Sequence, residues 1–215
     1  MPISNYSDLR NAVQDFLNRQ DLAIQAQTFI QLFETDANRT LRIRDGITGP
    51  VTISFLTDTA SLPADFLELK GAPTFGDAPL AYRTPEELSA ALANLSLIGD
   101  PSLYSIVGKN MRIAPMSPIS PGDPASDISI FYYQRVTPLA EPTDTNWLLQ
   151  LHPDLYLYGA LLQSAPYLKD DDRIGVWNGF RQQILEDIRI ADERSSYRGA
   201  TPVITPKGGS IGAWW

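Results

Sequence analysis

The spacing of apolar residues changes twice along this chain, and each change limits the structure that a segment can adopt. In residues 5–41 and again in residues 145–195, apolar side chains recur at steps of three and four residues, which gives a helix one buried stripe. Between these segments, apolar residues alternate with polar ones, as in half-buried strands. The sequence therefore predicts an α+β fold, mainly helical, with helices at both chain ends and strands between them.

Two amphipathic helices are predicted in the N-terminal segment. Their stripes contain, in the first helix, Tyr6, Leu9, Val13, Phe16 and Leu17 and, in the second, Phe29, Ile30, Phe33, Ala37 and Leu41. Because hydroxyl and carboxylate oxygens accept the free N–H groups at a helix start, Ser4 or Ser7 is expected to cap the first helix and Asp21 the second. The short connection between the helices predicts an antiparallel hairpin.

The middle of the chain contains several strand candidates and one helix. The first strand candidate alternates through Ile47, Val51, Ile53 and Phe55. "APLAYR" is a short candidate, the two β-prone runs around "GKN" predict a hairpin, and "DISIFYYQRV" is the densest in β-branched and aromatic residues. "TPEEL" predicts a helix start, with Thr84 as N-cap, Pro85 in the first turn and Glu87 as the capping-box partner. The buried side of that helix is expected to contain Leu88, Ala91, Leu92 and Leu95.

Helical spacing returns in the C-terminal third. Pro153 suits a first helical turn, and Pro166 is expected to end or kink that helix. Asp170, Asp171 and Asp172 place negative charge where the next helix begins, which its dipole favours. The expected stripes contain Leu155, Tyr158 and Leu162 in the first of these helices and Trp177, Phe180, Ile184, Ile188 and Ala191 in the second.

The simplest packing of these elements is a four-helix bundle formed by both chain ends. Residues 1–45 are predicted to supply an N-terminal helical hairpin, and residues 141–195 the helices that complete the bundle. Residues 46–140 form an inserted β-rich module with one short helix. Residues 196–215 follow as an extended C-terminal arm.

Composition excludes several functions. The formal charge is −8, from 25 acidic and 17 basic residues, whereas tight duplex binding requires clustered lysine and arginine. The chain has no cysteine, so disulfides, thiolate metal sites and a cysteine nucleophile are excluded. No apolar run reaches about eighteen residues, and the N-terminus lacks the layout of a secretory signal. We therefore expect a soluble protein made inside the cell, without a membrane partner.

No catalytic, metal or cofactor site is predicted. His152 is the only histidine, and "LHPD" has neither a nucleophile elbow nor a second imidazole, so it is interpreted as a residue at a helix start. Consecutive carboxylates at residues 170–172 point in different directions, which favours capping and solvation over cation binding. The glycine-containing stretches "GKN" and "GGSIG" lack the strand–loop–helix setting of a phosphate site.

The C-terminal arm is the strongest functional signal in the sequence. It contains no acidic residue and an excess of two positive charges, from Arg198 and Lys207. Prolines and four glycines interrupt its apolar residues, so it cannot form its own core. It is interpreted as a docking arm with apolar anchors, the alternative being a segment that folds back onto the bundle or a disordered end. The candidate docking residues are Tyr197, Arg198, Val203, Ile204, Lys207, Ile211, Trp214 and Trp215.

The order of several segments resembles a known family. "YSDLRNAVQDFLNRQDL", "LPADFLELK", "PLAYRTPEEL", "LYSIVGKNMRIAP", "ISIFYY" and the aromatic-rich "PDLYLYGALL" occur in this order within residues 5–195. Together they resemble the head–tail adaptor (head-to-tail connector) proteins of tailed bacteriophages, the kind that follow the portal in short-tailed phages. The resemblance implies a homo-oligomeric ring, usually of twelve copies, beneath the portal protein, with the arm reaching along the portal.

The role implied by this resemblance is structural. The ring extends the DNA channel, through which DNA passes without sequence-specific binding, and offers a platform to the tail nozzle or hub and, in some members, to tail fibres. The protein is then made in the host cytoplasm and located in the virion at the head–tail junction. The alternatives are a stopper or terminator ring of the same neck, a cell-wall hydrolase whose carboxylates would be Glu86, Glu87 or Glu186, and a generic interaction module.

Overall fold

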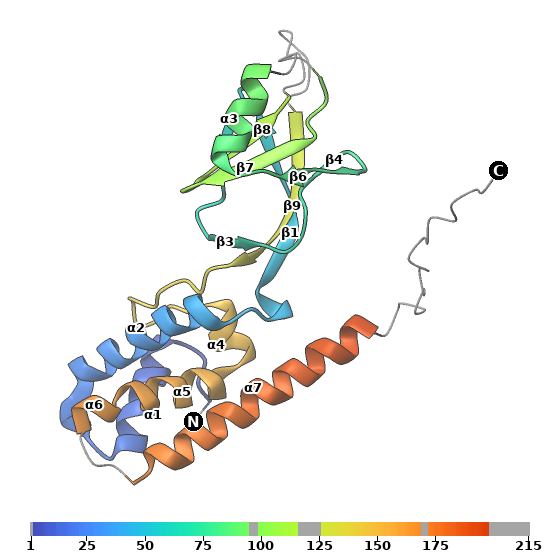
Figure 1. The fold of residues 1–215 in the computed structure, drawn as a ribbon. Helices are drawn as coiled ribbons and strands as arrows, with labels where there is room; N and C mark the ends of the chain where they lie inside the picture. The colour runs from blue at the N-terminus through green and yellow to red at the C-terminus, as the bar shows by residue number, and fades with distance from the viewer. Residues whose placement is uncertain (1, 95–98, 116–125, 169–171, 198–215) are drawn as a thin grey trace.

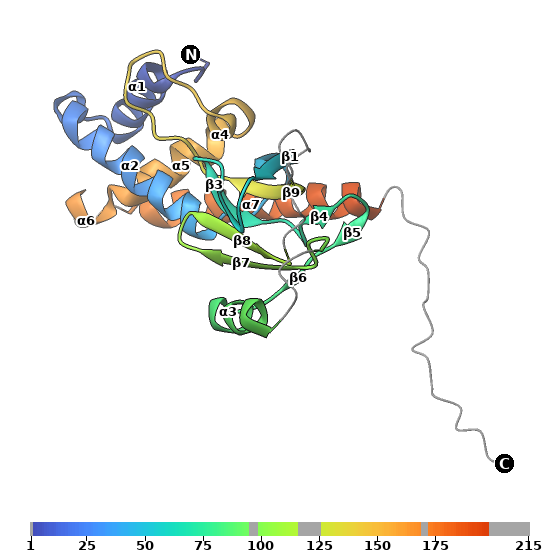
Figure 2. The same ribbon diagram turned by 90° about the horizontal axis from the view of Figure 1, so that it is seen from above.

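The chain folds into a helical domain and a β module, each with its own apolar core (Figure 1). The computed structural model describes residues 2–94, 99–115, 126–168 and 172–197. Helices from both ends of the chain form the helical domain, and the residues between them form the β module, so the α+β prediction is confirmed. Seen from above, the β module sits over one end of the helices (Figure 2).

The N-terminal hairpin consists of α1 (Tyr6–Leu17) and α2 (Ala23–Thr40), joined by the 3₁₀ turn η1 (Gln20–Leu22). Both expected caps were wrong. Asn5 caps α1, because its side-chain oxygen accepts the Asp8 N–H at 2.9 Å. Asp21 lies inside η1 and pairs with Arg19 at 2.7 Å, and α2 starts without a side-chain cap. The inserted 3₁₀ turn shifts the start of α2 past Asp21.

Four further helices complete the helical domain: α4 (Trp147–Leu151), α5 (Pro153–Gln163), α6 (Ala165–Leu168) and α7 (Ile174–Tyr197). Pro153 occupies the first turn of α5, as predicted. Pro166 falls in α6, after α5 has ended at Gln163. The arrangement of these helices as a closed four-helix bundle stays a prediction.

Helix α5 is the centre of the helical domain, because it packs against α1, α2 and α7. The stripe expected for it covers only part of the buried surface: Leu155 is buried, and Tyr158 and Leu162 are partly buried against the core. The residues that are buried lie around most of the helix: Leu155, Tyr156, Leu157, Gly159, Ala160 and Leu161. A helix covered on several sides has no polar face, and its sequence then loses the one-sided pattern that predicts a stripe.

Helix α7 is covered along a narrower line than the sequence predicts. Trp177 and Ile188 are buried, whereas Ala191 is exposed and Phe180 is 45% exposed. Phe180 instead stacks at the edge of the core on Tyr158, with ring centroids 5.1 Å apart. Because α7 packs mainly on α5, only the positions that face that one helix are buried.

The β module contains two sheets. In the first, β9 (Ser126–Gln134) pairs on one side with β1 (Ile47–Phe55) and on the other with β3 (Phe66–Leu69) and β4 (Thr74–Phe75), while β5 (Ala78–Pro79) continues from β4. The second has the order β2 (Thr59–Ser61), β8 (Asn110–Ala114), β7 (Leu103–Val107) and β6 (Ala81–Tyr82). Side chains from both sheets form the core of the module, among them Phe55, Met111, Ile113, Ile128 and Ile130.

Three sequence predictions in this module are confirmed. Strand β1 buries Ile53 and Phe55 and exposes the residue between them. The hairpin β7–β8 turns at "GK", with Gly108 at φ 62°, a conformation that glycine adopts without strain. At α3 (Pro85–Asn94), the Thr84 N–H donates to Glu87 Oε2 at 3.2 Å and the Glu87 N–H to Thr84 Oγ1 at 3.3 Å, which is the predicted capping box.

Two chain segments connect the module to the helices. The 3₁₀ turn η2 (Arg44–Gly46) leads from α2 into β1, and residues 135–146 lead from β9 to α4. The Asn38 side chain bonds both the N–H and the C=O of Val136, at 2.8 and 3.3 Å. Arg42 pairs with Glu68 of β3 at 2.7 Å. Val136 and Leu139 lie in the helical core, so the second segment is held there directly after β9.

Gly159 provides the first test of this packing. A Cβ atom at Gly159 would lie 2.2 Å from the ring of Phe33 on α2, whose side chain is itself buried. We expect Gly159→Ala to lower the free energy of unfolding by up to about 2 kcal/mol, since overpacking of about 1–3 kcal/mol is opposed by about 1 kcal/mol of helix propensity.

Gly179 on α7 is the matched control, because a Cβ atom there meets no atom within 4 Å. Gly179→Ala is expected to raise the free energy of unfolding by about 0.5–1 kcal/mol. Urea unfolding of both variants measures the difference. Equal effects in the two variants contradict the close packing of α5 on α2.

Candidate functional site

The structure locates the start of the predicted docking arm. Tyr197 is the last residue of α7. The other candidate docking residues lie outside the described residues: Arg198, Val203, Ile204, Lys207, Ile211, Trp214 and Trp215. The position of α7 therefore determines where the arm leaves the folded chain.

The C-terminal part of α7 extends away from the other helices (Figure 1). After Ile188, none of the described side chains of α7 is fully buried. The nine residues from there to Tyr197 correspond to about 14 Å of helix. Arg189 pairs with Glu186 at 2.7 Å and also with Glu193, and the hydrogen bond from Arg189 holds the pKa of Glu186 below its usual range. Pairs at this spacing support an exposed helix, so the arm begins at an exposed helix end.

A buried polar network connects the two ends of the chain inside the helical domain. Glu34 on α2 is 3% exposed, and its Oε1 accepts the Tyr156 hydroxyl at 2.6 Å and the Leu139 N–H at 3.0 Å. Asn146 donates to the Tyr156 oxygen at 3.2 Å and to the Thr137 carbonyl at 2.8 Å. The network therefore holds α2, α5 and the segment after β9 in one arrangement.

Burial changes the pKa values in this network. It raises the pKa of the Glu34 carboxyl, and the hydrogen bonds from Tyr156 and Leu139 partly oppose that rise. Burial, together with the charge of Glu34, raises the pKa of Tyr156 above its ordinary value. Because the folded state binds a proton on Glu34 more readily than the unfolded state, the free energy of unfolding falls as the pH rises from the ordinary to the raised pKa.

Glu34→Gln tests this relation. The amide oxygen of glutamine can accept both bonds that Oε1 accepts, while the charge is removed. We expect the variant to be at least as stable as the wild type at pH 7. Its advantage should shrink as the pH is lowered toward 4, because the wild-type carboxyl is then protonated. Urea unfolding between pH 4 and pH 8 measures the difference.

Tyr156→Phe is the control for the hydrogen bond itself. It removes one donor to the buried carboxylate and should cost about 1–3 kcal/mol. If Glu34→Gln destabilises as much as Tyr156→Phe at every pH, the charge of Glu34 has no role in the pH dependence.

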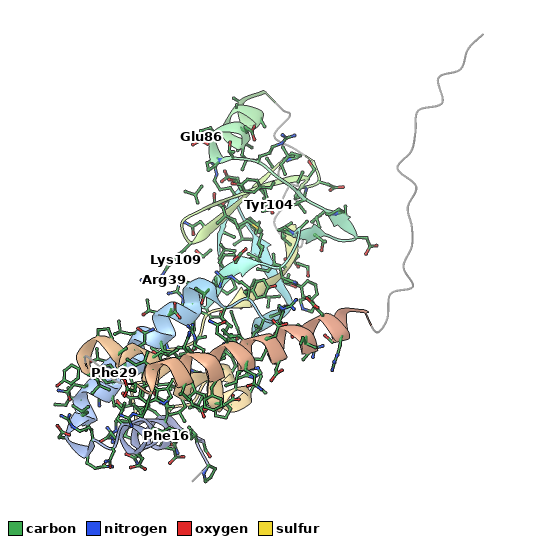
Figure 3. The ribbon with its side chains drawn as sticks, turned by 60° about the horizontal axis from the view of Figure 1, so that its bottom comes forward. Phe16, Phe29, Arg39, Glu86, Tyr104 and Lys109 are labelled. Carbon is green, nitrogen blue, oxygen red and sulfur yellow. The ribbon has the colours of Figure 1, made fainter. Side chains whose placement is uncertain are left out.

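A groove with unpaired arginines lies where the helical domain meets the β module. Its cavity of about 550 Å³ is lined by α2, β3 and the segment after β9, including Glu34, Arg39, Leu67, Arg135 and Pro138, so two arginines and one glutamate give it a formal charge of +1. Arg39 and Arg135 are exposed, and neither guanidinium has a hydrogen-bond or ion-pair partner among the described residues. In Figure 3 Arg39 lies on the same side of the molecule as Lys109 of the β7–β8 turn. We call this cavity the basic groove.

A second groove, lined by η2, the start of α5 and α7, is rich in carboxylates. Its cavity of about 320 Å³ is lined by Asp45, Asp154, Asp187 and Asp192, together with Arg44 and His152. The four aspartates and one arginine give it a formal charge of −3 with His152 neutral. Asp192 accepts the Arg44 N–H at 2.8 Å, whereas Asp187 is exposed and has no partner among the described residues. We call this cavity the acidic groove.

The sequence could not reveal either groove. Arg39 and Arg135 are far apart along the chain, and each stands in a segment whose pattern indicates only a helix or a strand. Glu34 stands in the apolar stretch "FIQLFE", where a buried carboxylate and a solvent-facing one look alike. The position of this carboxylate within an apolar stretch was the one sequence feature that could have indicated a buried glutamate.

His152, the histidine considered for catalysis, makes a structural contact. His152 precedes Pro153 at the start of α5, as predicted, and its Nε2 lies 3.2 Å from Asp45 Oδ2. Asp170 and Asp171 lie outside the described residues. Within the described ranges, no group of three or more His, Asp or Glu side chains is placed to bind a metal ion.

Residues 4–206, which include both cores and both grooves, match the family described as SU10 adaptor protein. The chain belongs to this family, a family of bacteriophage head–tail adaptors. The resemblance identified from the order of the sequence segments is thereby confirmed. A comparison with curated proteins finds no match.

Membership in the SU10 adaptor family assigns a structural role in the phage particle and implies a component of the virion neck. The family gives no support to the hydrolase alternative. The carboxylates that a hydrolase would use also lie apart. Glu86 and Glu87 are on α3 and Glu186 is on α7, and Figure 1 shows these two helices at opposite ends of the molecule. In the part of the chain that the structure describes, no helix has the length and apolarity needed to span a membrane.

Proposed function

We propose that this SU10-family adaptor forms a homo-oligomeric ring, of twelve copies as in the adaptors that it resembles, between the portal protein and the tail nozzle or hub of a short-tailed phage. In this proposal, residues 196–215 bind the portal protein, and the opposite side of the ring receives the tail and its fibres. The helices of both chain ends act as one bundle that supports the arm.

The exposed end of α7 is the observation that carries this proposal. The arm starts about 14 Å beyond the last buried residue of α7, Ile188, so it can reach a partner without unfolding the core. Its apolar residues cannot form a core of their own, and two adjacent tryptophans suit apolar pockets on a partner surface. Repetition of the arm around a ring converts weak single contacts into firm attachment.

The charge of the chain supports a channel that DNA slides through. A formal charge of −8 on each copy repels the phosphate backbone, so DNA should pass along the ring without being held there. A protein that packs DNA against its surface needs the opposite charge. The net charge therefore favours a passage over a DNA-binding platform.

Deletion of residues 196–215 tests the arm. The truncated chain should remain folded, because the described residues before the arm already form both apolar cores. We expect it to lose attachment to purified portal rings, measured by co-sedimentation. Undiminished attachment of the truncated chain contradicts the proposal. A stopper or terminator ring binds an adaptor instead of the portal, so the intact chain would then fail the same assay.

Point variants separate the anchors from the rest of the arm. Trp214→Ala and Trp215→Ala should each weaken portal attachment by at least about thirtyfold if they fill pockets, since buried aromatic anchors contribute about 2 kcal/mol or more. Thr201→Ala in the same arm is the control and should change attachment less than threefold. Equal effects at all three positions would leave the arm without defined anchors.

A further inference from the structure

The basic and acidic grooves occupy different elements of the chain. The first is formed by α2, β3 and residues 135–138, and the second by η2, α5 and α7. They share no lining residue, and α5 packs against both α2 and α7. Their charges are opposite, so each groove presents the charge that the other attracts.

The unpaired groups in these grooves indicate a contact that the single chain does not make. The guanidinium groups of Arg39 and Arg135 have no partner among the described residues, while the acidic groove of the same chain has an excess of carboxylates. Guanidinium groups bind carboxylates in strong paired hydrogen bonds. Since the two grooves belong to different elements of one fold and share no lining residue, we expect the arginines of one groove and the carboxylates of the other to meet between copies.

We propose that the occupant of the basic groove is a second copy of this chain, which presents its acidic groove through α7. Arg39 and Arg135 of one copy then lie against Asp187 and Asp154 of the next. Two different surfaces that complement each other make a head-to-tail contact, which closes into a ring when the rotation between copies allows. This inference rests on the proposed ring and names the surfaces that form it.

The position of the grooves suits a closed ring. The basic groove includes the second half of α2, and the acidic groove includes η2, which directly follows α2. Both therefore lie at the junction of the helical domain with the β module. In a head-to-tail contact, the junction of one copy would therefore face the junction of the next.

Charge also determines the orientation of the contact. Copies that each carry a formal charge of −8 repel one another on average. The head-to-tail pairing of these two grooves is an orientation in which local attraction opposes that repulsion. The association should therefore weaken as salt screens the paired groups.

Cross-linking provides a direct test, because the natural chain has no cysteine. Arg135→Cys and Asp187→Cys are made as two separate full-length proteins and mixed with a short bismaleimide cross-linker. A head-to-tail contact predicts that the mixed dimer forms at least about tenfold faster than either homodimer. Homodimers that form as fast as the mixed species overturn the pairing of the grooves.

Charge reversal is the second test, and self-association is measured by cross-linking or sedimentation velocity. Arg135→Glu and Asp187→Arg should each abolish self-association, and the chain that carries both should regain it because the charges are exchanged. Arg83→Glu makes the same charge change as Arg135→Glu at an exposed position outside both grooves and should have no effect. Circular dichroism checks that each variant folds. Failure of the double variant to regain association contradicts the proposal.

Portal attachment distinguishes this inference from the proposed function. If the mixed cross-link fails while the wild-type chain binds portal rings, the groove pairing is wrong and the adaptor role stands. If the mixed cross-link forms while the chain binds no portal ring, the groove pairing stands and the portal role is wrong.

Discussion

The close packing of α5 against α2 is the constraint on which the rest of the structure depends. Gly159 lets the ring of Phe33 lie against the backbone of α5, and one turn away the Tyr156 hydroxyl binds the buried carboxylate of Glu34. These contacts join residues more than 120 positions apart in the chain. Both ends of the inserted β module are thereby attached to a single core.

That attachment holds a module with its own core against the helices. It is connected at its base by the two paired strands β1 and β9, whose neighbouring segments enter the helical core. The bonds from Asn38 to Val136 and from Arg42 to Glu68 cross the same junction. Two strands, together with these hydrogen bonds and this ion pair, resist bending better than a single linker does. Both grooves lie at this junction. A ring subunit needs such a restraint if its contacts are to close.

Local signals in the sequence were sufficient for much of the fold. The change of period located the helices and strands, and the Thr84–Glu87 capping box and the hairpin at Gly108 were predicted because each depends on a few neighbouring residues. Predictions failed where contacts with a distant segment determine which residues are buried. The stripe on α5 was incomplete because three other helices cover that helix, and Phe180 is exposed because α7 has mainly one neighbour. The cap at Asp21 was wrong because a 3₁₀ turn intervenes.

The candidate sites also differ in whether local sequence or contacts between distant segments reveal them. The arm was identified from composition, because a segment with apolar residues between glycines and prolines cannot pack on itself. The grooves depend on side chains that only the fold brings together, as with Arg39 and Arg135. Family membership supplies the biological setting, and the exposed end of α7 and the two charged grooves supply physical reasons for contacts with a portal and with neighbouring copies.

An electron cryo-microscopy map of the assembled phage neck tests the central claim most directly. The proposed role predicts a closed ring of this chain directly beneath the portal, with density for Trp214 and Trp215 in pockets of the portal surface. A map in which these tryptophans lie against the helices of their own subunit, or in which another protein separates this chain from the portal, would contradict it.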